Sequence, residues 1–114
     1  TIVVAIIETR SGLANCDSIA AVDGIDVLFV GMSDLSFDMA AGGDKDDPAL
    51  WHGLQLVCDA CRRHGKCAGV GGIGILEHFA RAKAAGVRYF SAAHDAALLA
   101  TAAADRARTL RRLA

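Results

Sequence analysis

Residues 27–36, Val-Leu-Phe-Val-Gly-Met-Ser-Asp-Leu-Ser, decide how this chain is expected to fold. Their apolar start is typical of a buried strand, and Asp34 follows shortly after that strand ends. The same order recurs at residues 2–8, Ile-Val-Val-Ala-Ile-Ile-Glu, where Glu8 closes an apolar run. If these runs are neighbouring parallel strands, Glu8 and Asp34 emerge side by side at one rim of a sheet or barrel. Two carboxylates facing one cavity suit Mg²⁺ or Mn²⁺, which prefer oxygen ligands.

Strand and helix signals alternate along the chain and predict an α/β fold. Residue types that start or stop helices stand at the expected ends: Ser11 as a cap, Asp47-Pro48 at a helix start and Gly86 after a helix. Expected strands are residues 2–8, 26–30, 67–70 and 87–92, and expected helices are residues 11–22, 48–63, 75–85 and 94–113.

Four strand–helix units in series imply parallel strands with right-handed crossovers. At 114 residues the chain is expected to be one domain, residues 1–114. Two architectures fit. The units could form half of a (β/α)₈ TIM-type barrel, which takes about 250 residues. They could also form an open doubly wound sheet that is complete on its own. In both, ligands bind at the rim where the strands end.

Composition excludes several classes of function. The chain is 54% apolar with a net charge of −1, so nothing favours binding to nucleic acid or to an anionic membrane. Four late arginines, Arg106, Arg108, Arg111 and Arg112, are expected to complement the end of a helix. No apolar run reaches the roughly 20 residues that a membrane helix needs. No export signal is visible and the first residue is Thr, so we expect a processed, cloned or truncated terminus and a cytoplasmic location.

Four cysteines, with a C-x-x-C at Cys58 and Cys61, raise the question of zinc, redox chemistry or a disulfide. Leu54, Val57, Cys58 and Cys61 recur at helical spacing, which places both thiols on a buried stripe. No second C-x-x-C completes a structural zinc site. We therefore predict free thiols in the core, with a metal site and a redox pair as alternatives.

Structural roles compete with the functional interpretation of both acids. Glu8 could pair with Arg10, and Asp34 could cap a helix that begins at Leu35. Their equivalent positions after consecutive strands favour a shared metal or ligand role.

Gly69, Gly71 and Gly74 spell G-x-G-x-x-G between a predicted strand and a predicted helix, and Asp95 lies downstream. The short preceding strand and the third-unit position argue against a dinucleotide site, so we favour a flexible rim loop.

The histidines and the acidic residues 44–47 are assigned structural or surface roles. The histidines His52, His64, His78 and His94 are expected on helices or at helix ends, although His94 follows the fourth strand at the rim. Residues 44–47 lack the calcium-loop pattern and are expected to form a solvated loop.

The chain resembles the HpcH/HpaI aldolase family at Ile7-Glu8-Thr9-Arg10, Gly24-Ile25-Asp26 and Gly31-Met32-Ser33-Asp34-Leu35-Ser36. Asp47-Pro48, Gly65-Lys66 and Gly86-Val87-Arg88-Tyr89-Phe90 extend this resemblance. Met32 stands where the family usually has Pro, and Ile6 where Gln is frequent. Only the C-terminal half of the family's barrel is matched.

The resemblance implies a metal-dependent lyase that splits 4-hydroxy-2-oxo acids into pyruvate and an aldehyde. Glu8 and Asp34 would be the metal ligands for Mg²⁺ or Mn²⁺, with Co²⁺ possible, and Gly31, Ser33 and Asp34 would bind the 2-oxo acid. The general base, a histidine with an acidic partner, and a substrate-binding arginine belong to the other half of the barrel, so no catalytic residue is assigned in this chain.

An isolated half-barrel leaves two sheet edges and an apolar inner face open, which predicts self-association or pairing with the other barrel half. Family members are oligomers whose last helix packs on a neighbour, so the resemblance implies that residues 94–113 form an interface. The alternatives are an acyl-CoA ester lyase of the same superfamily, a non-catalytic half-barrel that binds metal or ligand, and a small dinucleotide-binding domain.

Overall fold

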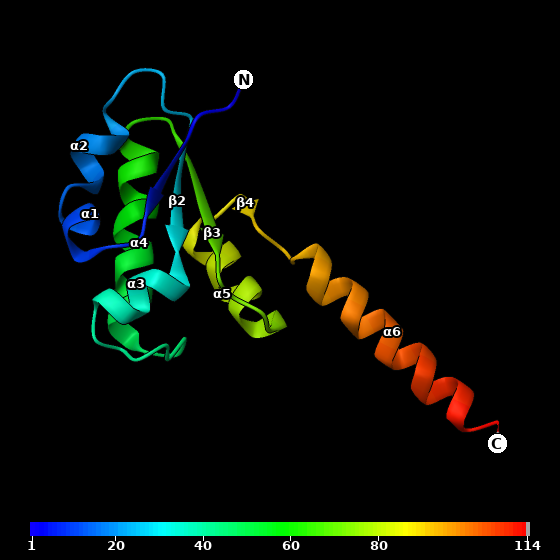
Figure 1. The fold of residues 1–114 in the computed structure, drawn as a ribbon. Coiled ribbons are helices and arrows are strands. Elements are labelled where there is room, and N and C mark those ends of the chain that lie inside the picture. The colour runs from blue at the N-terminus through cyan, green and yellow to red at the C-terminus, as the bar shows by residue number, and fades with distance from the viewer. Residues whose placement is uncertain (114) are drawn as a thin grey trace.

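The computed structural model describes residues 1–113 and contains a parallel sheet of four strands in the order β1-β2-β3-β4 (Figure 1). Each new strand is added beside the previous one, as in the wall of a barrel. A doubly wound sheet would instead reverse its strand order at a switch point. The elements are β1 (Val4–Ile7), α1 (Arg10–Ala14), α2 (Cys16–Ala20), β2 (Val27–Gly31), α3 (Met32–Asp38), α4 (Pro48–Arg63), β3 (Cys67–Gly71), α5 (Leu76–Ala85), β4 (Tyr89–Phe90) and α6 (Asp95–Arg111).

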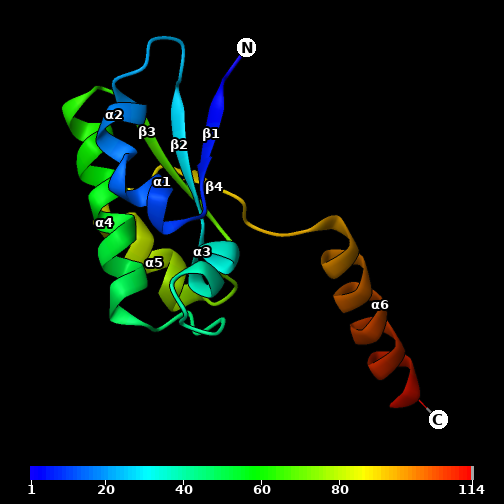
Figure 2. The same cartoon turned by 60° about the vertical axis from the view of Figure 1, so that its left-hand side comes forward.

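Helices cover one face of this sheet. In both views α1, α2 and α4 lie on the same side, and α5 lies beside α4 (Figures 1 and 2). Alternate strand residues point to that side, among them Ile7, Leu28, Val30 and Val70, and none of these four is more than 2% exposed. Burying such a side chain contributes about 1.5–3 kcal/mol, so this layer supplies much of the stability.

The opposite face of the sheet is open. Ile6, Phe29, Gly69 and Tyr89 stand side by side across the four strands. Ile6 is 59% exposed and Tyr89 is 43% exposed. In a closed barrel this face would line the interior. One-sided helices and an open apolar face together identify the chain as part of a TIM-type barrel.

The glycines of β3 make room for an aromatic ring on the open face. A Cβ atom on Gly69 would lie 2.7 Å from the Phe29 ring, and one on Gly71 would lie 2.6 Å from it. Phe29 also meets Tyr89 edge to face, with 6.0 Å between ring centroids. Packing within the sheet thus explains the first two glycines of the G-x-G-x-x-G spacing, whereas a Cβ atom on Gly74 would meet no atom within 4 Å.

The central helix, α4, has the ends that the sequence predicts. Asp47 caps it by accepting a hydrogen bond from the Ala49 N–H at 2.7 Å, and Pro48 takes the first position. Gly65, at φ +66°, lets the chain turn just beyond the helix. Its buried residues include Leu54, Val57, Cys58 and Cys61, so the predicted apolar stripe is confirmed.

Two predicted elements differ in the structure. Residues 11–22 do not form one helix, because the chain breaks at Asn15 into α1 and α2. Asn15 donates its side-chain amide to the Ser11 carbonyl at 2.8 Å, a local bond that competes with helix continuation. The cap is Thr9, which accepts from Gly12 N–H at 3.0 Å, and not Ser11. The strand expected at residues 87–92 is reduced to the two residues of β4.

Helix α6 projects away from the rest of the molecule (Figures 1 and 2). None of its 17 residues is buried, and Leu98, Leu99 and Leu110 are exposed. The molecule consequently measures 60 × 34 × 21 Å. Within residues 1–113, no helix has both the length and the apolar character needed to cross a membrane.

Candidate metal and substrate site

The structure places Glu8 and Asp34 on one cleft at the carboxyl ends of the strands. Strands β1 and β2 pair from Val4 opposite Val27 to Ile7 opposite Val30, so Glu8 follows directly at the rim. A Cβ atom on Gly31 would come within 3.4 Å of the Glu8 Cβ and 3.5 Å of its Oε2. The cleft has a volume of about 330 Å³ and is lined by Ile6, Glu8, Phe29, Gly31, Ser33, Asp34, Gly71, Gly72, Ser91 and His94.

Neither carboxylate is used elsewhere in the described fold. Within residues 1–113, Glu8 and Asp34 form no side-chain hydrogen bond or ion pair. Arg10 instead contacts Asp38, through its backbone N–H at 2.6 Å and its Nε at 3.6 Å. The residue that caps α3 is Gly31, and Asp34 lies within the first turn. The two structural explanations that the sequence left open for these acids therefore do not apply.

This pair of carboxylates fits a hard divalent cation. Nothing in residues 1–113 brings three His, Cys, Asp or Glu side chains together around a common metal position. The described part of the chain therefore offers two carboxylates on one cleft. Mg²⁺ commonly binds through one or two carboxylates and keeps several waters or substrate oxygens. Which ion binds, and whether both acids hold it, remain predictions.

The turn that carries Asp34 is packed from the side of β3. Gly72 has φ +78°, and a Cβ atom there would lie 2.7 Å from Ser33 Oγ and 2.9 Å from Ser33 N. The loop after β3 thus touches the start of α3 directly. Only glycine allows this approach, because other residues would clash and would also be strained at that φ.

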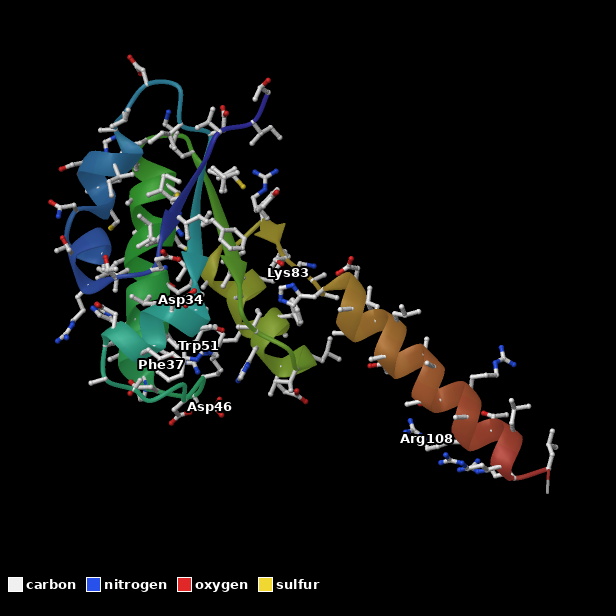
Figure 3. The ribbon with its side chains drawn as sticks, in the orientation of Figure 1. Asp34, Phe37, Asp46, Trp51, Lys83 and Arg108 are labelled. Atoms are coloured by element: carbon white, nitrogen blue, oxygen red, sulfur yellow. The ribbon has the colours of Figure 1, made fainter. Side chains whose placement is uncertain are left out.

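Lys45 contacts the same turn from the other side. Its ammonium donates to the Met32 carbonyl at 3.1 Å and to Ser36 Oγ at 3.3 Å. Burial lowers the pKa of Lys45, and the nearby charge of Asp34 opposes that shift. Figure 3 shows Asp34 on α3, with Trp51 and Asp46 below it.

Phe29, Ser91 and His94 are among the cleft residues that were not assigned a site role from the sequence. Phe29 and Ser91 lie on the same side of the sheet as Glu8, so strand alternation could have indicated them. His94 precedes α6, makes no side-chain cap bond and lines the cleft. Its position after the fourth strand was the available signal.

Two of the other three histidines and the acidic loop have structural partners, and His52 is exposed on α4. His64 lies 3.1 Å from Asp17, and His78 lies 2.9 Å from Asp46. In the loop at residues 44–47, the Asp46 N–H donates to Asp44 at 2.8 Å and Asp47 caps α4. Residues 44–47 form a loop, and the Asp46 side chain is 79% exposed, so the expectation of a solvated loop is confirmed. These contacts also hold the loop in place.

The core-thiol prediction is confirmed. All four cysteines are free, and Cys16, Cys58 and Cys61 are buried. Burial raises the pKa of the Cys58 thiol to about 11. A thiol that stays protonated at neutral pH is a poor nucleophile and a poor metal ligand.

Residues 1–113 match the sequence profile of a family described as HpcH/HpaI aldolase/citrate lyase. The chain belongs to this family. A 4-hydroxy-4-methyl-2-oxoglutarate aldolase of Chaetomium globosum is 40% identical to this chain. The aligned region covers 90% of this chain and 39% of that aldolase. A hydroxypyruvate/pyruvate aldolase of Rhizorhabdus wittichii is 40% identical over 87% of the chain and 40% of its own length.

Solved structures of HpcH/HpaI proteins show the same arrangement. A family protein from Burkholderia cenocepacia superposes with a TM-score of 0.87 at 26% identity, covering 97% of this chain and 43% of that one. An HpcH/HpaI aldolase from Desulfitobacterium hafniense superposes with a TM-score of 0.85 at 27% identity. The match covers 96% of this chain and 42% of that one. The chain thus spans about two fifths of the length of these HpcH/HpaI relatives, and its fold is a segment of their TIM-type barrel.

Proposed function

We propose that the protein containing this segment is a metal-dependent carbon–carbon lyase that splits 4-hydroxy-2-oxo acids into pyruvate and an aldehyde. The observation that carries this proposal is the pair Glu8 and Asp34, two carboxylates on one cleft at the strand ends that have no other partner within residues 1–113. Family membership supports it, since relatives are named as aldolases of such acids.

In this proposal the side chains of Glu8 and Asp34 hold Mg²⁺ or Mn²⁺. Such an ion would supply Lewis acidity at the 2-oxo group of the substrate. Gly31 leaves space beside Glu8, which a larger residue would take. The backbone N–H groups of Ser33 and Asp34 would bind the substrate carboxylate, because N–H groups in the first turn of a helix lack partners within that helix. The general base comes from outside this segment.

The assembly is part of the same proposal. The open face with Ile6, Phe29 and Tyr89 would be covered by the remaining strands of the barrel. Exposed apolar patches of this kind mark interaction surfaces. Helix α6, which buries no residue here, would pack against a neighbouring copy of the protein.

Metal binding by the complete protein tests the ligand assignment. We expect Glu8→Gln or Asp34→Asn to weaken Mn²⁺ binding, followed by electron paramagnetic resonance, by more than about 100-fold. Asp38→Asn is the matched control, because Asp38 lies on the same helix but pairs with Arg10. Unchanged affinity in both site variants would refute the assignment.

Substrate tests separate the aldolase from its main alternative. Pyruvate release from a 4-hydroxy-2-oxo acid, abolished by either site substitution, would support the proposal. Cleavage of a 3-hydroxyacyl-CoA thioester without cleavage of 4-hydroxy-2-oxo acids would favour an acyl-CoA ester lyase instead. Metal binding without either activity would leave a binding module.

A further inference from the structure

The first turn of α3, which carries Asp34, is held by a chain of polar contacts that begins at Lys45. The Lys45 ammonium donates to the Met32 carbonyl at 3.1 Å and to Ser36 Oγ at 3.3 Å. The Ser36 hydroxyl is fully buried and donates in turn to the Ser33 carbonyl at 2.7 Å. The residues on both sides of Asp34 are thus linked, directly or through Ser36, to one lysine in the following loop.

Helix α3 needs such support because it has only seven residues. Isolated helices shorter than about 12–15 residues are marginal in water. The position of Asp34 therefore depends on tertiary contacts. Met32 and Leu35 are buried in the core and fix the apolar side of α3. Lys45 supplies hydrogen bonds to the backbone of α3 and to the buried Ser36 hydroxyl.

Lys45 is itself fixed from α4 and α5. Its carbonyl accepts a hydrogen bond from Trp51 Nε1 at 2.7 Å. The adjacent Asp46 lies 2.9 Å from the buried His78 of α5. The Trp51 and His78 rings are 5.5 Å apart, and the Arg81 guanidinium lies 4.2 Å from the centre of the Trp51 ring. Figure 3 shows Asp46 and Trp51 close to the end of this loop.

We propose that Lys45 is a positioning residue for the metal site: it holds the first turn of α3 so that the Asp34 carboxylate stays in the cleft with Glu8. This inference rests on the proposed function only for its metal-binding readout. A positioning role and a purely electrostatic role of Lys45 predict opposite changes in metal affinity when the ammonium is removed. A positive charge near Asp34 opposes the approach of a cation, so removing that charge alone would tighten metal binding. Removing a support would weaken it.

The experiment compares Lys45→Met with the wild-type complete protein, because Met keeps much of the side-chain length without the ammonium. We expect Mn²⁺ affinity, followed by electron paramagnetic resonance, to fall about 10-fold, as for other residues that orient a metal ligand. Lys45→Arg, which keeps the charge and the donors, should recover most of the loss. Ser36→Ala should weaken binding too, and the double variant should lose less than the sum of both effects.

Lys66→Met serves as the control lysine, because Lys66 donates to the Val22 carbonyl at 3.3 Å and does not line the cleft. It should leave Mn²⁺ affinity unchanged. Tighter or unchanged Mn²⁺ binding in Lys45→Met would overturn the positioning role.

Hydrogen exchange without metal tests the inference independently of the proposed function. In Lys45→Met the amides of residues 32–38 should exchange at least about 10-fold faster while those of α4 keep their protection. Unchanged exchange in α3, or uniformly faster exchange across both helices, would contradict a local support. If Glu8→Gln and Asp34→Asn both retained Mn²⁺ affinity, the proposed function would fail while this exchange result would still decide the role of Lys45.

Discussion

On the helix-covered face of the sheet Ile7 is 2% exposed, whereas on the open face its neighbour Ile6 is 59% exposed. Both belong to β1, a strand that is apolar on both sides. Such runs are typical of strands buried on both faces, as in barrels with outer helices. The two faces of the sheet have different roles. The covered face stabilises the segment, and the open face carries the cleft at its rim and exposes apolar residues suited to a covering layer.

The largest effect is expected in the covered layer. Leu28→Ala should lower the free energy of unfolding of the complete protein, measured in urea, by about 2–5 kcal/mol, because removing a fully buried leucine side chain leaves a cavity.

Ile6→Ala in the same protein tests the open face. If the rest of the barrel covers it, its cost should also lie near 2–5 kcal/mol. A cost close to zero would show that this face stays exposed to solvent.

A smaller effect is expected where the two faces meet at the rim. Gly72→Ala should destabilise the protein by about 1–3 kcal/mol, because it forces alanine into a left-handed backbone against Ser33. It should also weaken Mn²⁺ binding by displacing the turn that carries Asp34. Gly74→Ala is the control, since a Cβ atom there would meet no atom within 4 Å. Equal effects of the two substitutions would contradict the close packing at Gly72.

The smallest effect concerns the buried thiols behind the covered face. The pKa of Cys58 is raised by burial from 9.0 to about 11, so the unfolded chain loses this proton first as pH rises. The stabilising contribution is complete below pH 9 and is lost progressively between pH 9 and 11. The difference in unfolding free energy between wild type and Cys58→Ala should therefore shrink over that range. A constant difference would show that the thiol ionises as easily in the folded protein.

Local chemistry explains what could be predicted from the sequence. Asp47-Pro48 and Gly65 mark the ends of α4, and Gly86, at φ +113°, ends α5 as expected. Strand alternation and equivalent positions after two strands brought Glu8 and Asp34 to one rim. These features depend on residues close together in the chain, or on the regular geometry of parallel strands.

The remaining features depend on contacts between distant residues. The Asp46–His78 pair joins positions 32 residues apart, and no local pattern announces it. The support from Lys45 depends on how its loop folds back on α3. The break at Asn15 reflects a side-chain bond that competes with the helix. Within residues 1–113 the short strand β4 pairs with β3 on one edge and with no strand on the other. The sequence of β4 itself does not reveal this.

The glycines of β3 have a consequence for the shape of the cleft. Because Gly69 and Gly71 contribute no side chains, the Phe29 ring occupies the space above them and forms one wall of the cleft. Trimming that ring would deepen the cleft toward the centre of the sheet without touching either acid. If the protein is the lyase proposed above, selection for bulkier aldehyde substrates would act through this one aromatic position and leave Glu8 and Asp34 unchanged.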